Sequence, residues 1–380
     1  MVIDLTSFCV AKYKLNDDAA SAVVVDSQGF SNGTYSGGEA DTHTIHRAGK
    51  INGSFYWGAL ADKINTNATF QSTFRNNFSM SIWVKPIHGR PPTYDAYFGV
   101  SDTSQNNLIT LHQTPAGGLY FEYGAGGALT SIETSALFTA GDNTNDWHHI
   151  VVVAEQSGSK VKLSIYFDGV FAGSYISDNN ITMSNYTNSL NLYIGNYNWS
   201  EWDTANDMLF GGLDDTMIFN KALSTDEIAF LYNDGAGTED LIHYDNIEEV
   251  LFSSITMTGN EVMIILSTAK VYLHEIPQGT ALPAIVYQQD ATGFNDTAQE
   301  TIALKKKTYQ FTCWASTMTG AIALSEALQD VLNATKGIYG NFKVERCRPT
   351  NESDAIAETT DENLKRKGRR VDYEVVYQEI

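Results

Sequence analysis

Cysteine is scarce in this sequence: its 380 residues contain three, Cys9, Cys313 and Cys347. Cysteines so far apart form no disulfide framework, and none has the close Cys or His neighbour of a zinc site. The N-terminus, MVIDLTSFCVAKYKL, lacks the basic stretch and apolar core of a secretory signal. No apolar run approaches the ~18 residues of a membrane-spanning helix. We therefore expect a protein that does not span a membrane and does not rely on disulfides or zinc.

Basic side chains are also few compared with acidic ones. The chain carries 24 Lys and Arg against 45 Asp and Glu, a formal net charge of −21. Most of the excess lies in residues 1–240, with 11 basic against 26 acidic side chains. Such a surface repels phosphate backbones, which argues against general nucleic-acid binding by this part. It is compatible with calcium or with neutral glycans.

Apolar side chains are plentiful, at 43% of the sequence with 12% aromatic, so the chain has enough of them for real cores. Residues 1–240 contain strand after strand, separated by Gly, Asn, Asp and Ser, and helical periodicity appears only at 224–232. This pattern predicts an all-β sandwich. The expected strands include residues 78–87, 118–124, 147–155, 160–169 and 189–196.

The stretch GGLDDTMIFNKALSTDEIAFLYNDG, residues 211–235, looks like the end of a domain. A strand leads into a short helix whose first residues, Ser224 to Glu227, have the form of a capping box, and Gly235 follows as a stop signal. We therefore divide the chain into two domains, residues 1–240 and 241–380.

The first domain resembles the laminin-G-like, concanavalin A-like jelly roll over residues 1–238. The resemblance rests on the order of DSQGFSNGTY, SMSIWVKP, NDWHHIVVV, LSIYFDGVFAG, LYIGN and GGLDDTMIF. In that superfamily a structural calcium ion often sits between the early Asp-Ser loop and the Asp of the final strand, which implies Asp26, Asn32 and Asp214 as ligands. Calcium prefers several hard oxygen ligands. The alternative is that Asp26 and Asn32 form a turn and Asp214 caps a strand end.

Related glucanases carry catalytic carboxylates in an E-x-D-x-x-E pattern, whose nearest match here is EWDTAN. Glu201 and Asp203 fit, but Asn206 stands where the acid/base is needed, and an amide cannot donate that proton. Asp207 would point to the other face of a strand. We therefore expect no glycosidase activity and no other enzymatic function.

The same loop, YNWSEWDTAND, contains Tyr197 and two tryptophans among polar side chains. Aromatic faces next to fixed hydrogen-bonding groups are suited to sugar rings. The alternative is that the aromatic rings pack against the sandwich edge. The predicted glycan-binding residues are Trp199, Trp202, Asp203 and Asn206.

The last 140 residues alternate between helical and strand patterns. This predicts an α+β domain with an antiparallel sheet and packed helices. Short helices are expected near residues 246–252 and 259–268, and a long one at 316–337. In the long helix, Leu324, Leu328, Val331 and Leu332 form the apolar stripe. The expected strands are 270–276, 281–289, 303–315, 341–347 and 370–380, and the last has Val371, Tyr373, Val375 and Tyr377 on one face.

This second domain resembles the tail-completion, or tail-terminator, family of long-tailed bacteriophages. The matching segments are PQGTALPAIVYQQ, YQFTCWASTMTGAIALSEALQDVL and RRVDYEVVYQEI. Members of that family are not enzymes. They form a homo-oligomeric ring, usually of six subunits, that stops growth of the tail tube and joins it to the head connector. The resemblance thus implies a protein of the virion neck, assembled in the host cytoplasm, whose partners are the tail tube and connector proteins.

The basic clusters of this domain are candidates for the ring lumen, through which DNA would pass without sequence-specific binding, or for the subunit interface. A polar loop is expected at 347–370, as ring subunits need. The alternative for the clusters is a solvated hairpin end. The residues are Lys305, Lys306, Lys307, Lys365, Arg366, Lys367, Arg369 and Arg370.

The sequence thus favours a tail-terminator domain with an outward laminin-G-like domain that contacts cell-surface glycans or the virion surface. The rival is a carbohydrate-binding surface protein whose C-terminal domain only oligomerises. A secretory signal would favour the rival.

Overall fold

In the computed structural model the chain forms two compact units. The first consists of Leu5–Leu241, and the second consists of Ile242–Ile380 together with Met1–Asp4. Strand β1 (Ile3–Asp4) pairs with β19 (Ile242–His243) in that second unit. The described residues are 3–59, 61–87, 91–138, 146–198, 209–244, 250–251, 270–273, 282–289, 304–339, 342–356 and 367–379.

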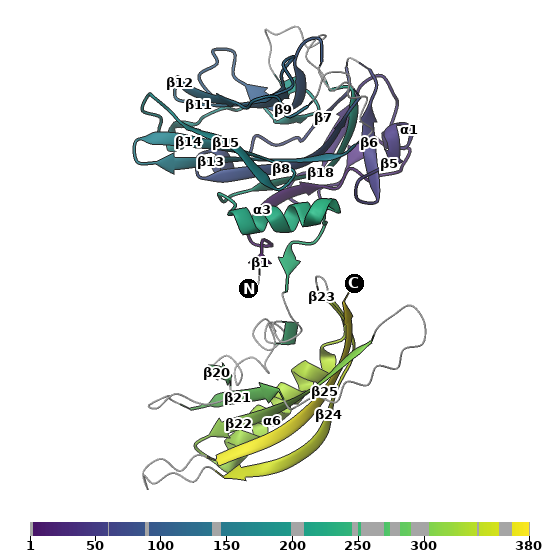
Figure 1. Cartoon of the computed structure of the whole chain (residues 1–380), viewed down its shortest axis with the longest axis vertical. Helices are drawn as coiled ribbons and strands as arrows, with labels where there is room; N and C mark the ends of the chain where they lie inside the picture. The colour runs from purple at the N-terminus through teal and green to yellow at the C-terminus, as the bar shows by residue number, and fades with distance from the viewer. Residues whose placement is uncertain are drawn as a thin grey trace. The chain divides into compact units, whose positions relative to one another are not determined.

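The first unit is a sandwich of two β-sheets (Figure 1). Within the described residues, one sheet has nine strands and the other eight. The order in the first is β12 (Ala128–Glu133), β11 (Leu119–Ala125), β10 (Leu108–Gln113), β9 (Asp95–Ser101), β16 (Tyr193–Ile194), β7 (Lys63–Asn65), β4 (Gly33–Ser36) and β3 (Val23–Val24), with β17 (Tyr197–Asn198) on β9. The order in the second is β15 (Val170–Ile176), β14 (Lys160–Phe167), β13 (His148–Ser157), β8 (Phe78–Pro86), β18 (Gly211–Phe219), β6 (Gly53–Trp57) and β5 (His46–Ala48), with β2 (Cys9–Tyr13) on β18.

The core lies between the two sheets and follows the two-residue period of strands. In β10, Ile109 and Leu111 belong to the buried core, whereas the alternate residues Thr110 and His112 face away from it. The described residues of this unit also contain four short helical turns: α1 (Thr42–Ile45), α2 (Gln71–Phe74), η1 (Met183–Asn185) and η2 (Asn233–Gly235).

Helix α3 (Thr225–Tyr232) packs on the outer face of the eight-stranded sheet (Figure 1). Ser224 accepts a hydrogen bond from the backbone N–H of Glu227, whose side chain accepts one from Ser224 in return. This confirms the predicted capping box. Tyr232 stacks on Trp83 of β8 with ring centroids 5.8 Å apart, which fixes the helix against the sheet.

The described residues of the second unit form a six-stranded sheet with one long helix on one face (Figure 1). Helix α6 (Met318–Ala334) is capped by Thr317, whose side chain accepts a hydrogen bond from the N–H of Gly320. The predicted apolar stripe of α6 is buried. All neighbouring strands are antiparallel except β20 and β21. The sheet order is β20 (Lys270–Leu273), β21 (Ala284–Gln289), β22 (Lys305–Ala315), β25 (Lys367–Glu379), β24 (Phe342–Ile356) and β23 (Gly337–Tyr339).

The structure confirms the predicted fold class but corrects the polar loop expected at 347–370. Strand β24 continues to Ile356 and β25 begins at Lys367, so most of this segment is a hairpin. Its charged side chains form cross-strand pairs: Arg369 contacts Glu352 at 2.6 Å and Asp354 at 2.8 Å. Such cross-strand ion pairs stabilise a solvent-facing strand. The polar composition of the segment does not by itself show that these pairs form. Most of the two short helices predicted before residue 270 lies outside the described residues.

Candidate functional site

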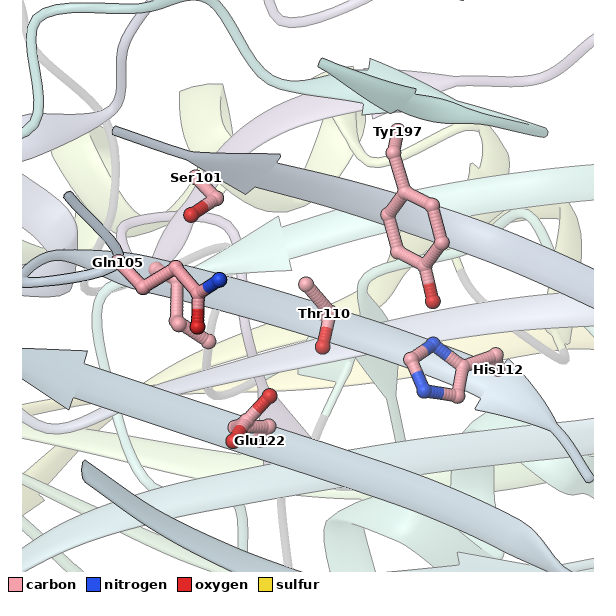
Figure 2. Close-up of a pocket in the computed structure, with 7 residues that line it drawn as sticks. Ser101, Gln105, Thr110, His112, Glu122 and Tyr197 are labelled. Atoms are coloured by element: carbon pink, nitrogen blue, oxygen red, sulfur yellow. The ribbon is translucent and has the colours of Figure 1, made fainter. Parts of the chain in front are cut away.

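A pocket of about 70 Å³ opens on the outer face of the nine-stranded sheet (Figure 2). Strands β9, β10 and β11 lie side by side here and present alternate residues away from the core. In Figure 2, Thr110 and Glu122 lie between Ser101 and Gln105 at one end and His112 and Tyr197 at the other. The lining residues are Ser101, Gln105, Leu108, Thr110, His112, Glu122 and Tyr197.

Tyr197 reaches the pocket because Gly99 leaves space for its ring. Strand β17 runs parallel to β9, with Tyr197 opposite Gly99. A Cβ atom at Gly99 would lie 2.1 Å from Cδ1 of Tyr197, so any larger residue would displace the ring. Only 5% of Tyr197 is exposed, and the ring therefore forms a fixed wall of the pocket.

Two polar atoms of the pocket keep hydrogen-bonding capacity. Within the described part of the chain, neither Oγ1 of Thr110 nor Nδ1 of His112 has a hydrogen-bond partner, although both atoms are buried. The His112 imidazole stacks on Tyr120 at 5.1 Å and meets Tyr94 and Tyr197 edge-on. Burial lowers the pKa of His112 to about 3, so the ring is neutral at physiological pH. A neutral imidazole nitrogen and a hydroxyl can both bond to a ligand hydroxyl.

Glu122 adds a carboxylate to the pocket lining, next to Thr110. Burial raises its pKa, while the Tyr120 hydroxyl, 3.4 Å from Oε1, opposes the shift. The arrangement combines one carboxylate, neutral hydrogen-bonding groups and an aromatic wall. Because ligand pockets for whole small molecules measure roughly 300–1,000 Å³, a space of this size suits a hydroxyl or short substituent of a larger ligand.

The predicted glycan-binding residues Trp199, Trp202, Asp203 and Asn206 lie outside the described residues, so their role stays a prediction. Their neighbour Tyr197 lines the pocket. Sequence reasoning missed Thr110, His112 and Glu122. The available signal was the period of two in LITLHQ, where inward Ile109 and Leu111 leave Thr110 and His112 outward.

The predicted calcium ligands differ in their hydrogen-bond partners. Asp26 accepts four backbone N–H groups, from Lys12, Gln28, Phe30 and Ser31. A carboxylate offers about four lone-pair sites, so these bonds favour the interpretation of Asp26 as a turn former. Asn32 accepts from the backbone N–H of Asp26, which brings these two residues together.

Asp214 lies on β18, fully buried, and accepts from the backbone N–H of Ile51 at 2.8 Å. Burial raises its pKa to about 8, which favours the protonated carboxyl at neutral pH. No group of three or more His, Cys, Asp or Glu in the described parts could hold a metal ion. Calcium binding therefore stays a prediction. A bound ion would have to offset the cost of burying the ionised Asp214 carboxylate.

If Asp26, Asn32 and Asp214 do hold calcium, the sandwich should melt at a higher temperature in calcium than in chelator. Calcium at ~100-fold above its dissociation constant would add about 2.7 kcal/mol to the free energy of unfolding. Asp214→Ala should remove the difference. Identical melting curves of the wild-type chain in calcium and in chelator would show that these residues are structural only.

The predicted basic clusters fall on two strands of the second unit. Lys305 to Lys307 begin β22 and Lys367 to Arg370 begin β25, so antiparallel pairing puts them at opposite ends of these strands. Lys365 and Arg366 lie outside the described residues. Lys306 contacts Glu374, which also accepts from Arg346 at 2.7 Å and from Arg348 at 3.1 Å.

These cations, Lys306 first, hold the pKa of Glu374 below its usual range, so it stays ionised at neutral pH. Three cations surround one carboxylate, so positive charge is in excess around Glu374.

Comparison with known families gives one match in each of the two units. Residues 58–229 match the concanavalin A-like lectin/glucanases superfamily, and residues 256–378 match the family of tail completion protein gp17. Both predicted resemblances are confirmed, as a fusion of the two in one chain.

Among solved structures, the chain is similar to the CBM40 of Ruminococcus gnavus IT-sialidase, with 14% identity, a TM-score of 0.34, and coverage of 41% of this chain and 83% of that one. It is also similar to Trypanosoma rangeli sialidase in complex with sialic acid, with 14% identity, a TM-score of 0.43, and coverage of 61% and 34%. No curated protein matches the chain. In the described part, no helix is long and apolar enough to cross a membrane.

Proposed function

We propose that this chain is a structural protein of a bacteriophage tail, in which the C-terminal unit completes the tail and the sandwich is an accessory binding domain. The observation that carries the proposal is the match of residues 256–378 to the tail completion family. In the full form of the proposal, copies of the C-terminal unit form a ring, with six subunits as the expected number. The ring ends the tail tube and joins it to the head connector at the neck of the virion.

The C-terminal unit supports a role in assembly. Helix α6 covers one face of its sheet, and the described residues of the other face include polar and charged side chains such as Gln310, Asp372 and Glu374. A polar face with the cations around Glu374 is suited to subunit contacts or to a water-filled lumen that DNA crosses without sequence-specific binding. Growth of tail tubes in the presence of the full chain tests the proposal.

The sandwich is proposed to bind a neutral glycan through the pocket on the nine-stranded sheet. The support is the lectin part of the family description together with Thr110 and His112, which offer hydrogen bonds beside the aromatic wall of Tyr197. Glu122 is the one carboxylate among the described lining residues, whereas glycoside hydrolysis uses two. The site therefore favours binding over hydrolysis.

A weak glycan contact would be sufficient in a ring. Once one subunit binds a polysaccharide, each further contact is intramolecular, so overall avidity can exceed single-site affinity by about 10²–10⁴-fold. The proposal thus assigns the sandwich a role that a tail-completion ring alone does not need, namely holding the virion near a polysaccharide-coated cell.

Thr110→Val is expected to weaken glycan binding by about 3- to 10-fold, because it removes one neutral hydrogen bond while keeping the side-chain shape. The measurement is a glycan array probed with assembled protein, followed by titration of any sugar that binds. Thr130→Val is the matched control, since Thr130 is also buried with an unpartnered Oγ1 but does not line the pocket. Equal binding by the two variants would show that the pocket is not the glycan site.

A further inference from the structure

A second and larger pocket, of about 400 Å³, lies on the outer face of the other sheet of the sandwich. Its floor is a row across three neighbouring strands: Gly212 of β18 is flanked by Tyr56 of β6 and Lys85 of β8. Arg47 of β5 lies beside this row, because it pairs with Ser54 two residues before Tyr56. The lining residues are Arg47, Ala48, Ser54, Tyr56, Lys85, Ile87, Trp147 and Gly212.

The pocket depends on a glycine in the same way as the first. A Cβ atom at Gly212 would lie 2.7 Å from Cη2 of Trp147, so the indole ring sits directly over the glycine backbone. Neighbouring residues on β18 and β6, Leu213 and Phe55, point into the core. The outward residues therefore place the Trp147 indole over Gly212, with the Tyr56 ring on the neighbouring strand.

Two cations stand at these rings. The Lys85 ammonium group lies 6.0 Å from the ring centroid of Trp147, and the Arg47 guanidinium lies 6.0 Å from that of Tyr56. Arg47 donates through Nη1 to the carbonyl oxygens of Thr44 and His46, and its remaining N–H groups can bond elsewhere. In the described part of the chain, neither cation forms an ion pair with a carboxylate.

The charge of this pocket is opposite to that of its surroundings. Residues 1–240 carry 26 acidic against 11 basic side chains, yet the described lining has two cations and no carboxylate. Unpaired cations beside aromatic faces are suited to a ligand that has both an anionic group and a ring with an apolar face. A sugar ring with a carboxylate or phosphate substituent meets both requirements.

We propose that this pocket binds an anionic saccharide. The sugar ring packs on Trp147 and Tyr56, and its anionic group lies between Lys85 and Arg47. The volume of the pocket falls within the roughly 300–1,000 Å³ typical of small-molecule sites, so it can take a whole sugar unit. This site is on the opposite sheet from Thr110 and His112, and it differs from that site in charge as well as size.

Titration calorimetry of the full chain tests the proposal with three probes: a galacturonic acid trimer, mannose 6-phosphate and a neutral galactose trimer. We expect at least one charged probe to bind and the neutral trimer to bind far more weakly. The preferred charged probe tells a carboxylate from a phosphate ligand. Lys85→Gln and Arg47→Gln should each lower the affinity for that probe by about 10- to 100-fold, as expected for a charge-assisted hydrogen bond.

Lys63→Gln is the matched control, because Lys63 also lies over an aromatic ring, Tyr193, but on the other sheet. It should leave the affinity within about twofold, since Lys63 lies on the other sheet and does not line this pocket. The proposal is overturned if neither charged probe binds better than the neutral trimer, or if Lys63→Gln weakens binding as much as Lys85→Gln. It is also overturned if Thr110→Val, and not Lys85→Gln, removes binding, because the ligand would then occupy the first pocket.

Discussion

Gly99→Ala is expected to abolish glycan binding at the first pocket and to destabilise the sandwich. The new Cβ would lie 2.1 Å from Cδ1 of Tyr197, and a buried aromatic ring has little room to move. Overpacking of this kind typically costs about 1–3 kcal/mol of the free energy of unfolding. Displacing Tyr197 would also remove the aromatic wall next to His112.

Two further variants separate the effect on packing from the effect on binding. Gly173→Ala is the control, because its Cβ would meet Ile132 at 3.4 Å, an ordinary contact. The double variant Gly99→Ala with Tyr197→Ala should relieve the overlap at position 99, so its cost in stability should be smaller than the sum of the single costs. It should still fail to bind glycan. If the Gly99→Ala variant has the same melting temperature and the same glycan affinity as the wild-type chain, the position of the Tyr197 ring against Gly99 is wrong.

Leu328→Ala should lower the stability of the C-terminal unit by about 2–5 kcal/mol, the range for deleting a fully buried leucine side chain. Leu328 lies on α6 and packs in a core with Phe311 and Tyr373 from the sheet. Hydrogen exchange of the α6 amides in the full chain measures the change without interference from the sandwich.

Ile322→Ala provides the comparison on the same helix, since Ile322 is 38% exposed and leaves a smaller cavity. Its α6 amides should exchange nearly as slowly as those of the wild-type chain. Equal acceleration by the two substitutions would contradict the assignment of Leu328 to the core.

Local sequence signals predicted the elements whose structure depends on nearby residues. Ser224 and Glu227 form the expected capping box, and the four apolar residues of the α6 stripe are buried as their spacing indicates. In β25, Val371 and Tyr373 lie in the core, as the period of two predicts. In each case the signal lies in the spacing of residues a few positions apart, so the pattern is visible in the sequence.

The pockets could not be predicted in this way because they join distant residues. Tyr197 meets Gly99 only through the pairing of β17 with β9, and Trp147 meets Gly212 only in the folded sheet. The lowered pKa of His112 likewise comes from burial, not from its neighbours in sequence. The hairpin of β24 and β25 was predicted as a loop because its cross-strand ion pairs are not apparent from composition.

Tube growth in vitro tests most directly the proposed role of this chain in completing a phage tail. Purified tail tube protein from the same phage is polymerised with and without the full chain, and tube lengths and ends are measured by negative-stain electron microscopy. We expect the chain to stop growth at substoichiometric amounts and to appear as a ring at one end of each tube. Mass measurement of the capped ends then gives the number of subunits.

The Thr110→Val variant should cap tubes as well as the wild-type chain, because Thr110 lies in the sandwich and the proposed ring is formed by the C-terminal unit. We expect short tubes with a ring at one end. Tubes that grow to the same length with free ends in the presence of the chain would contradict it.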